Sequence, residues 1–288
     1  MTSLNIILTG GLGNQMLQYA FGRAHELRGH TVTFNKKEFG STVRDREETD
    51  FLPAPHLNQL DAQHYIFAYG LDMFKTKVVF GPSVGEFRDT GVVFDPRYMT
   101  IDTPMTLRGL WWNENYFKDM GDRIREEFSP AFPISPEAEA LTKRMQGGNS
   151  VFMHVRRGDY TIPAVAECHN SMPLSYYEKA LKVISDKHPN PQVFIFSDDT
   201  EWCSENMPWG EVVRIGNRYI DLWLMSQCRH AIIANSSYSW WGAWLGDYQK
   251  DRVVVGPERW FTSKGTIIRN GTQNELHFMP DRWVCLSV

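Results

Sequence analysis

The second half of the chain alternates short apolar runs with amphipathic segments, and this alternation constrains the fold more than any other feature. Strands that are separated by helices run parallel in one sheet, with helices covering both faces. We therefore predict an α/β fold with a parallel sheet in this half. The predicted strands are 150–156, 192–197, 211–215, 230–234 and 252–255, and the predicted helices include 175–187, which opens with a Ser175/Glu178 capping box, 220–227 and 238–246.

The N-terminal segment predicts a second Rossmann-like unit. An apolar run at 4–9 is followed by a glycine-rich turn, a helix at 15–27 and a strand at 31–34. A dinucleotide fingerprint needs a third glycine where Met16 stands, and no P-loop motif is present, so NAD and P-loop chemistry are disfavoured. Either the turn is only a tight connection, or Gly13, Asn14 and Gln15 bring amides and polar side chains to a ligand.

The domain boundary is predicted at a small linker, Gly147–Asn149. A helix capped by Ser135 with Pro136 in its first turn precedes this linker, and a further helix is expected at 115–128. We predict one domain at 1–149 and a second at 150–288, with a cleft between them and with a C-terminal tail that can pack back on the first domain.

Composition excludes several classes of protein. The 288 residues carry a net charge of −4 with 42% hydrophobic residues, so an ordered protein is expected and a nucleic-acid partner is not. The four cysteines form no C-x-x-C and are expected to be reduced thiols. The chain shows neither a signal peptide nor an apolar run that could span a bilayer, which predicts a cytoplasmic, bacterial protein. Peripheral membrane association stays open.

The run His154–Tyr160 (HVRRGDY) is the strongest candidate for an anion site. Side chains of a strand alternate, so His154 and Arg156 share one face while Arg157 points the other way. Arginine binds phosphate bidentately and keeps its charge. The structural alternative is a salt bridge between Arg157 and Asp159 or their neighbours, which would leave one arginine functional and the other structural.

The run Asn235–Trp241 (NSSYSWW) lies between a predicted strand and a predicted helix. Amides and hydroxyls at a helix N-terminus attract phosphate, whereas the alternative is a helix cap by Ser236 or Ser237 with tryptophans in the core. No Asp-x-Asp and no zinc-binding helix motif occurs. We therefore expect a phosphate site built from arginine and amides, with no metal and no cofactor.

Three runs, GGLGNQMLQYA at 10–20, HVRRGDY at 154–160 and NSSYSWWGAWL at 235–245, resemble the bacterial alpha-1,2-fucosyltransferases, glycosyltransferase family eleven. The resemblance implies a GT-B-type fold, a GDP-fucose donor, no metal and inversion at the fucose anomeric carbon. It also implies that the domain at 150–288 binds GDP-fucose and that the domain at 1–149 lies on the acceptor side. Within the second domain, Arg156 would hold the pyrophosphate and Asp221 would help to bind guanosine. The remaining donor-binding residues that we predict are Gly13, Asn14, Arg157, Asn235, Ser236, Ser237 and Tyr238.

The resemblance and the chemistry together predict a mechanism. Arg156, with His154, would stabilise the charge that develops on departing GDP, and Asp159 would be the base, with His154 as the second choice. The acceptor is predicted to be a galactose-terminated glycan, fucosylated at its 2-hydroxyl for surface polysaccharide synthesis. The predicted acceptor-binding residues are Asn14, Gln15, Trp111, Trp112, Tyr116 and Tyr160.

Two alternatives remain open: a fucosyltransferase of another linkage, such as alpha-1,6, and a non-catalytic sugar-binding module. The segment around His169-Asn170 departs from the family pattern, in which a His-Gly usually ends this loop. The identity of the acceptor is what this departure puts in question.

Overall fold

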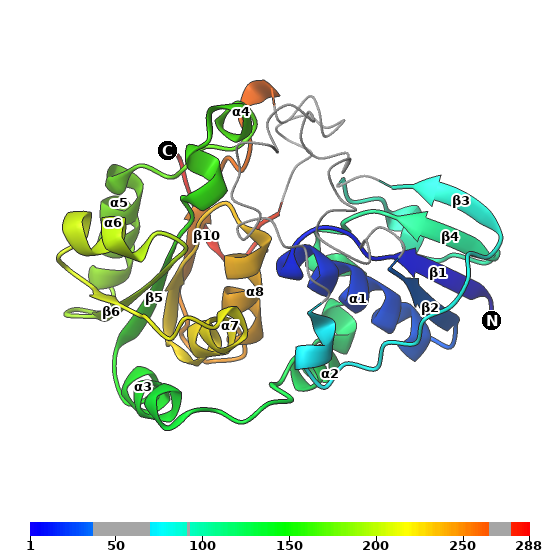
Figure 1. Ribbon diagram of the computed structural model, residues 1–288, viewed down its shortest axis with the longest axis horizontal. Coiled ribbons are helices and arrows are strands. Elements are labelled where there is room, and N and C mark those ends of the chain that lie inside the picture. Colours follow the sequence, from blue (N-terminus) through cyan, green and yellow to red (C-terminus); the bar gives the residue numbers. More distant parts are fainter. Residues whose placement is uncertain (37–69, 91–92, 265–277) are drawn as a thin grey trace. The chain divides into compact units, whose positions relative to one another are not determined.

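The computed structural model describes residues 1–36, 70–90, 93–264 and 278–288. The chain divides into two compact units, one formed by Met1–Ala131 and Thr266–Pro280, the other by Phe132–Gly265 and Asp281–Val288 (Figure 1). Each unit is described by itself. Within the described ranges, no helix is long and apolar enough to cross a membrane.

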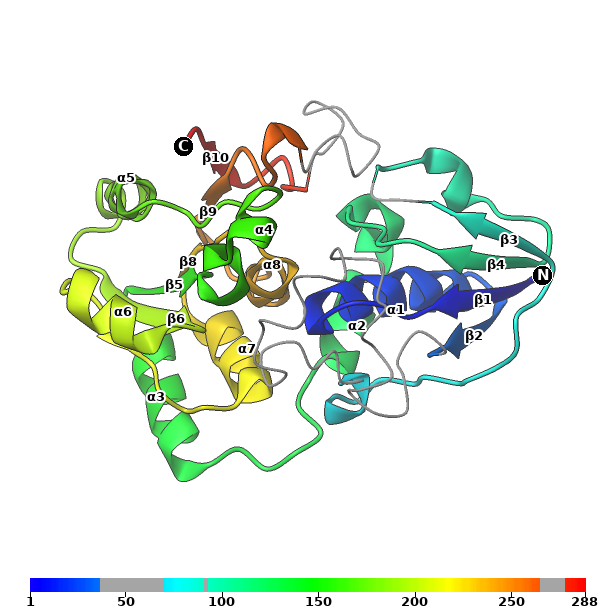
Figure 2. The same cartoon turned by 45° about the horizontal axis from the view of Figure 1, so that its top comes forward.

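The first unit contains a four-stranded parallel sheet in the order β2-β1-β4-β3 (Figure 2). Helix α1 follows β1 directly, and most of its side chains are buried, as expected for a helix that packs on a sheet. The elements are β1 Ser3–Ile7, α1 Leu12–Leu27, β2 Thr31–Asn35, β3 Glu86–Asp89, β4 Met105–Arg108 and α2 Gly121–Glu127, with 3-10 turns η4 Leu71–Met73, η5 Pro96–Met99, η6 Glu114–Tyr116 and η7 Lys118–Met120.

The helix predicted at 115–128 is broken into η6, η7 and α2. Asn113 starts the first turn by accepting a hydrogen bond from the amide of Asn115. Phe117, at φ −143°, then interrupts the helical path between η6 and η7. The prediction was wrong because a local side-chain cap and the burial of Phe117 override the helical pattern.

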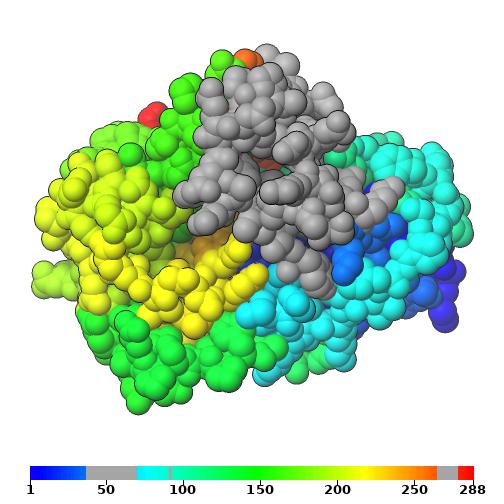
Figure 3. All heavy atoms as spheres, in the orientation of Figure 1, coloured from blue at the N-terminus to red at the C-terminus, as the bar shows by residue number. Residues whose placement is uncertain are grey.

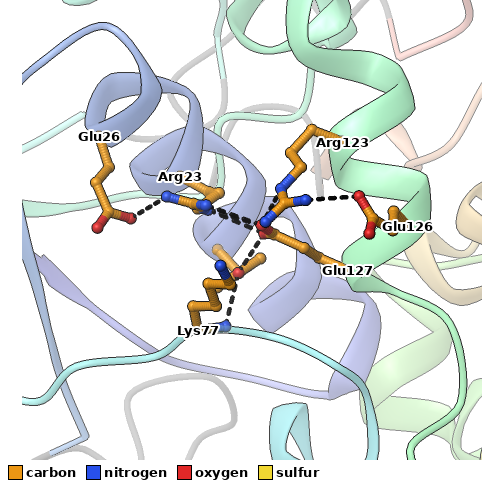
Figure 4. A network of polar contacts seen from close by, with 7 residues as sticks. Arg23, Glu26, Lys77, Arg123, Glu126 and Glu127 are labelled. Carbon is orange, nitrogen blue, oxygen red and sulfur yellow. Dashed lines mark hydrogen bonds and ion pairs between the residues drawn. The ribbon is translucent and has the colours of Figure 1, made fainter.

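A buried ion-pair network ties α1 to α2 (Figure 4). The Glu127 carboxylate is 2% exposed and accepts hydrogen bonds from Arg23, from Arg123 and from the Tyr19 hydroxyl at 2.6 Å. Tyr19 also accepts the amide of Lys77. Burial raises the pKa of Glu127, but the bonds from Arg23 and Tyr19 outweigh it, so this pKa lies below its ordinary value. The charges are thus satisfied within the unit.

The second unit contains a six-stranded parallel sheet in the order β10-β9-β8-β5-β6-β7. Read from β7, the strands come third, second, first, fourth, fifth and sixth along the chain, which is the Rossmann order. The elements are α3 Pro136–Gln146, β5 Ser150–Val155, η8 Gly158–Thr161, α4 Pro163–Ala166, α5 Leu174–Ser185, β6 Gln192–Ser197, α6 Thr200–Asn206, β7 Glu211–Val212, α7 Arg218–Gln227, β8 His230–Ile232, α8 Ser237–Leu245, β9 Val254–Pro257 and β10 Val284–Leu286.

Helices cover both faces of this sheet. Helices α5 and α6 lie on one face and α7 and α8 on the other (Figures 1 and 2). Val151, Met153 and Val155 of β5 point into the core with Tyr176 and Tyr177 of α5, so β5 is buried on both sides. The predicted fold class is confirmed, because the chain is an α/β protein with two Rossmann-like domains, as in the GT-B type.

Three details of the prediction were wrong. The units divide after Ala131 rather than at Gly147–Asn149, because α3 packs against α7 and β5 of the second unit. The Ser175 capping box does not form, because α5 begins one residue earlier and Pro173 is its N-cap. By contrast, the predicted cap of α3 is confirmed, since Ser135 accepts a hydrogen bond from the amide of Ala138. The last strand of the sheet is β10, which follows 252–255 and had not been predicted.

Candidate functional site

The candidate site of the second unit lies where the strand order reverses, between β5 and β8. Ligands of open α/β sheets bind outside the carboxyl ends of the strands at this point. The loop after β5 and the loop after β8 meet here, because the Tyr160 hydroxyl donates to the backbone oxygen of Asn235 at 3.1 Å. The HVRRGDY and NSSYSWW runs, far apart in sequence, therefore share one edge of the sheet.

Arg156 lies at the centre of this edge, between two carboxylates. Its Nη2 is 2.5 Å from Oδ1 of Asp159, and its Nη1 is 2.5 Å from Oδ2 of Asp198. The Tyr160 ring lies 5.4 Å from the guanidinium carbon. The Arg156 side chain keeps 32% of its surface exposed, so the guanidinium is held in place yet accessible. This geometry suits recognition of an anion.

Arg157 has a structural environment. Its Nε donates to Asp199 at 3.0 Å, and its guanidinium carbon lies 3.8 Å from the centre of the Trp202 ring. The expectation that one arginine is structural is met by Arg157, but its partner is Asp199, while Asp159 pairs with Arg156. Nothing in this arrangement supports the predicted donor-binding role of Arg157.

Asp198 was not predicted as a site residue. Its Oδ1 accepts the amides of Arg157 at 2.9 Å and Gly158 at 3.2 Å, while its Oδ2 pairs with Arg156. A Cβ atom on Gly158 would lie 2.7 Å from that Oδ2, so glycine permits the close approach. The sequence places Asp198 directly after the predicted strand 192–197, but only the pairing of β6 with β5 shows that it reaches Arg156.

His154 is 5% exposed, and its Nδ1 has no hydrogen-bond partner within the described part of the chain. Burial lowers the pKa of His154 to about 4, Asp198 opposes this shift and Arg156 adds to it. The imidazole is therefore neutral at neutral pH and is a weak base. It lies 5.6 Å from the ring of Tyr238 on α8.

The serine turn leads into α8. Ser236 is the N-cap residue, one of the two predicted positions, but its side chain makes no capping hydrogen bond to the described residues. Trp240, Trp241 and Trp244 are buried, which confirms that the tryptophans of this run pack in the core. Ser237 begins the helix.

Asn235 connects three loops. It is 2% exposed, and its Nδ2 donates to the backbone oxygens of Asn170 at 3.0 Å and Trp260 at 2.9 Å. The Tyr160 ring, whose hydroxyl reaches Asn235, stacks on His169 at 4.9 Å. The amide nitrogen of Asn235 thus holds backbone, while the predicted contact of Asn235 with the donor stays a prediction.

Asp221 lies in the first turn of α7, which Asn217 caps. Its Oδ1 is buried without a hydrogen-bond partner among the described residues. Burial raises the pKa of Asp221 to about 7. A nearby charge on Asp221 also contributes, after burial, to the raised pKa of Tyr238. A buried carboxyl with an unused oxygen is a recognised sign of a ligand site.

The polar turn of the first unit is largely occupied by its own backbone. Gln15 is buried; its Nε2 donates to Gly10 O at 2.9 Å and its Oε1 accepts the Gly70 amide at 3.2 Å. Gly10 has φ +72°, and a Cβ there would lie 2.7 Å from Nδ2 of Asn14. Gly13 is buried inside α1. Gln15 is therefore structural, whereas half-buried Asn14 stays a candidate.

The predicted aromatic platform for the acceptor is wrong for three of its four members. Trp111, at φ +45°, stacks on Phe21 at 4.3 Å, and Tyr116 packs edge-on against the same ring at 5.3 Å. Trp112 is buried and lies 4.5 Å from Phe278. These rings fill the core of the first unit and offer no face to a sugar. Tyr160 alone is half-exposed.

The chain has relatives among the glycosyltransferases. The model of glycosyl transferase family 11 matches residues 93–267. The chain belongs to glycosyltransferase family 11. The family 11 chain is 29% identical to the O-antigen biosynthesis glycosyltransferase WbnK of Escherichia coli, over 97% of this chain and 99% of that one. It is also 29% identical to an alpha-1,2-colitosyltransferase of Escherichia coli, over 96% of each chain.

A more distant relative is the galactoside alpha-(1,2)-fucosyltransferase 1 of Lagothrix lagotricha, 28% identical over 66% of this chain and 55% of that one. The resemblance noted from the three sequence runs is thereby confirmed, and the protein is a glycosyltransferase. Within the described ranges, no group of three or more His, Cys, Asp or Glu side chains is placed to hold a metal ion.

Proposed function

We propose that this family 11 transferase moves L-fucose from GDP-fucose to the 2-hydroxyl of a terminal beta-galactose, with inversion and without a metal, in surface polysaccharide synthesis. The names of its relatives supply the linkage, since two are alpha-1,2-transferases and one acts in O-antigen biosynthesis. The acceptor is taken from the galactoside-specific relative.

One observation carries the donor assignment: the second unit holds both an accessible guanidinium, on Arg156, and a buried carboxylate oxygen without a partner among the described residues, on Asp221. Arg156 would take the diphosphate bidentately, and Asp221 would accept N1–H and N2–H of guanine, a donor pair that adenine lacks. Tyr238 lies near both elements that carry these groups. Its ring is 5.6 Å from that of His154 on β5, and its hydroxyl donates to the backbone oxygen of Arg218, where α7 begins.

Catalysis would rest mainly on charge. Arg156 and the first amides of α8 would stabilise negative charge on departing GDP. The diphosphate would compete with Asp159 for Arg156, which leaves the Asp159 carboxylate to accept the proton of the attacking hydroxyl. His154, whose pKa of about 4 leaves it neutral at neutral pH, is the second candidate for the base.

The test is incubation of the purified protein with GDP-fucose and a set of beta-galactosides, followed by two-dimensional NMR of the product. An alpha-linked fucose on the galactose 2-hydroxyl is expected. Fucose on the 3-, 4- or 6-position, or a beta anomer, would refute the linkage, and glycan binding without donor consumption would point to the sugar-binding module.

A second candidate is colitosyl transfer, which the alpha-1,2-colitosyltransferase relative favours at 29% identity. Colitose is fucose without its 3-hydroxyl, so the nucleotide contacts proposed above would be the same for both donors. The ratio of kcat/KM for GDP-fucose and GDP-colitose decides between them. A site that hydrogen-bonds the 3-hydroxyl would strongly disfavour GDP-colitose.

A further inference from the structure

The guanidinium of Arg156 is oriented by a carboxylate that comes from the end of a neighbouring strand. Asp198 directly follows β6 and reaches across to β5, where its two oxygens have separate partners. Oδ2 takes Nη1 of Arg156 at 2.5 Å, and Oδ1 takes the amides of Arg157 at 2.9 Å and Gly158 at 3.2 Å. One carboxylate thus fixes both the guanidinium and the backbone that carries it.

The chain is built to admit this contact. A Cβ on Gly158 would lie 2.7 Å from Oδ2 of Asp198 and 3.1 Å from its Cγ. Any residue other than glycine would push the carboxylate away from Arg156. The register brings the two positions together, because Val155 pairs with Ser197 at the ends of β5 and β6.

The neighbouring Asp199 has a different task. Its Oδ2 pairs with Arg157 at 3.0 Å, and its Oδ1 accepts the Trp202 amide at 3.2 Å and so caps α6. Two adjacent aspartates of equal chemistry therefore serve the two arginines separately. The Asp199–Arg157 pair supports the start of α6, whereas the Asp198–Arg156 pair joins the ends of β6 and β5.

We infer that Asp198 is a positioning residue that acts through Arg156, turning its guanidinium toward the diphosphate of the donor. The inference rests on the proposed GDP site. Charge repulsion alone predicts the opposite effect. A carboxylate near a diphosphate repels it, so neutralising Asp198 should then tighten the binding of GDP. If Asp198 is needed to orient Arg156, neutralising it should weaken binding instead.

A double-mutant cycle separates these two cases, with the affinity for GDP measured by calorimetry in each variant. Asp198→Asn should weaken GDP binding about tenfold in the wild-type background, the scale of one charge-assisted hydrogen bond. In the Arg156→Ala background the same change should cost less than about twofold, since the residue through which Asp198 acts is gone. Asp199→Asn is the matched control, and its effect should be the same in both backgrounds.

Unchanged or tighter binding by Asp198→Asn, or an equal loss in both backgrounds, would overturn the inference. If Asp198→Asn does not fold, Gly158→Ala displaces the same carboxylate without changing any charge and is judged by the same criterion. Titration of the wild-type protein with GDP, ADP and UDP tests the proposed donor separately. Preference for another nucleoside diphosphate would refute the donor, and the cycle would then be measured with that nucleotide.

Discussion

The turn after β1 and the loop after β5 occupy equivalent places in two parallel sheets, yet they use their polar side chains in opposite ways. After β1, Gln15 bonds Gly10 O and the Gly70 amide, and Gln18 bonds the Thr9 amide and Gly109 O. These neutral side chains tie the backbone of their own unit together. The turn is stabilised largely by satisfying itself.

After β5 the side chains are charged, and Arg156 is shared by two carboxylates yet stays accessible. In the same unit, Asp221 of α7 keeps a buried oxygen without a partner among the described residues. The comparison teaches that the same strand–turn–helix topology supports either a structural turn or a ligand site. Charge and unsatisfied hydrogen-bonding capacity distinguish the two, whereas position in the fold does not.

The largest expected effect is on the charged side of this comparison. Arg156→Ala should lower kcat/KM by an amount that corresponds to about 3 kcal/mol of lost transition-state stabilisation. The reason is that it removes the group proposed to face the negative charge that develops on GDP. Arg156→Lys should restore little, since lysine cannot bind bidentately. Arg157→Ala is the control and should lower the melting temperature, because it breaks the contacts with Asp199 and Trp202. Near-normal turnover by Arg156→Ala would show that the assignment is wrong.

A smaller effect is expected on the neutral side. Gln18→Leu should lower the free energy of unfolding by about 2 kcal/mol, because the Thr9 amide and Gly109 O lose their partner. The kcat/KM for the donor should stay close to wild type. Urea denaturation measures the loss, and Gln192→Leu, at an exposed position, is the control. If Gln18→Leu reduced turnover while leaving stability intact, the two loops would not differ as described.

The titration of Asp221 should change the affinity for GDP by at most about tenfold per pH unit. Its pKa of about 7 means that the carboxyl is protonated below this pH, and the protonated form cannot accept both guanine donors. GDP affinity should therefore fall as pH decreases below about 7 and level off above it. Asp221→Asn is measured in parallel, and the pH dependence of its GDP affinity should reflect only the titration of GDP itself. An identical pH profile for both proteins would exclude Asp221 from guanine recognition.

The smallest expected effect is that of a chelator. Because Arg156 is proposed to stabilise the diphosphate where other transferases use a metal ion, EDTA should leave the fucosyl transfer rate unchanged. The rate is measured after dialysis against EDTA, with and without added manganese. Loss of activity that manganese restores would contradict the metal-free proposal.

Sequence by itself determined the parallel α/β units and the edge at which the site lies. Strand-to-helix alternation leaves few alternatives to a parallel sheet, and HVRRGDY and NSSYSWW directly follow predicted strands, so their place at the carboxyl ends was predictable. The alternation of β5 also predicted that Arg156 and Arg157 diverge, as they do.

Only the tertiary structure decided which polar and aromatic groups are used internally. Trp111 and Tyr116 became core residues because Phe21 of α1 packs between them, a contact across more than eighty positions that no local pattern encodes. The division after Ala131 follows from the packing of α3 on α7. The role of Asp198 depends on the pairing of β6 with β5, since side-chain partners are set by which strands become neighbours.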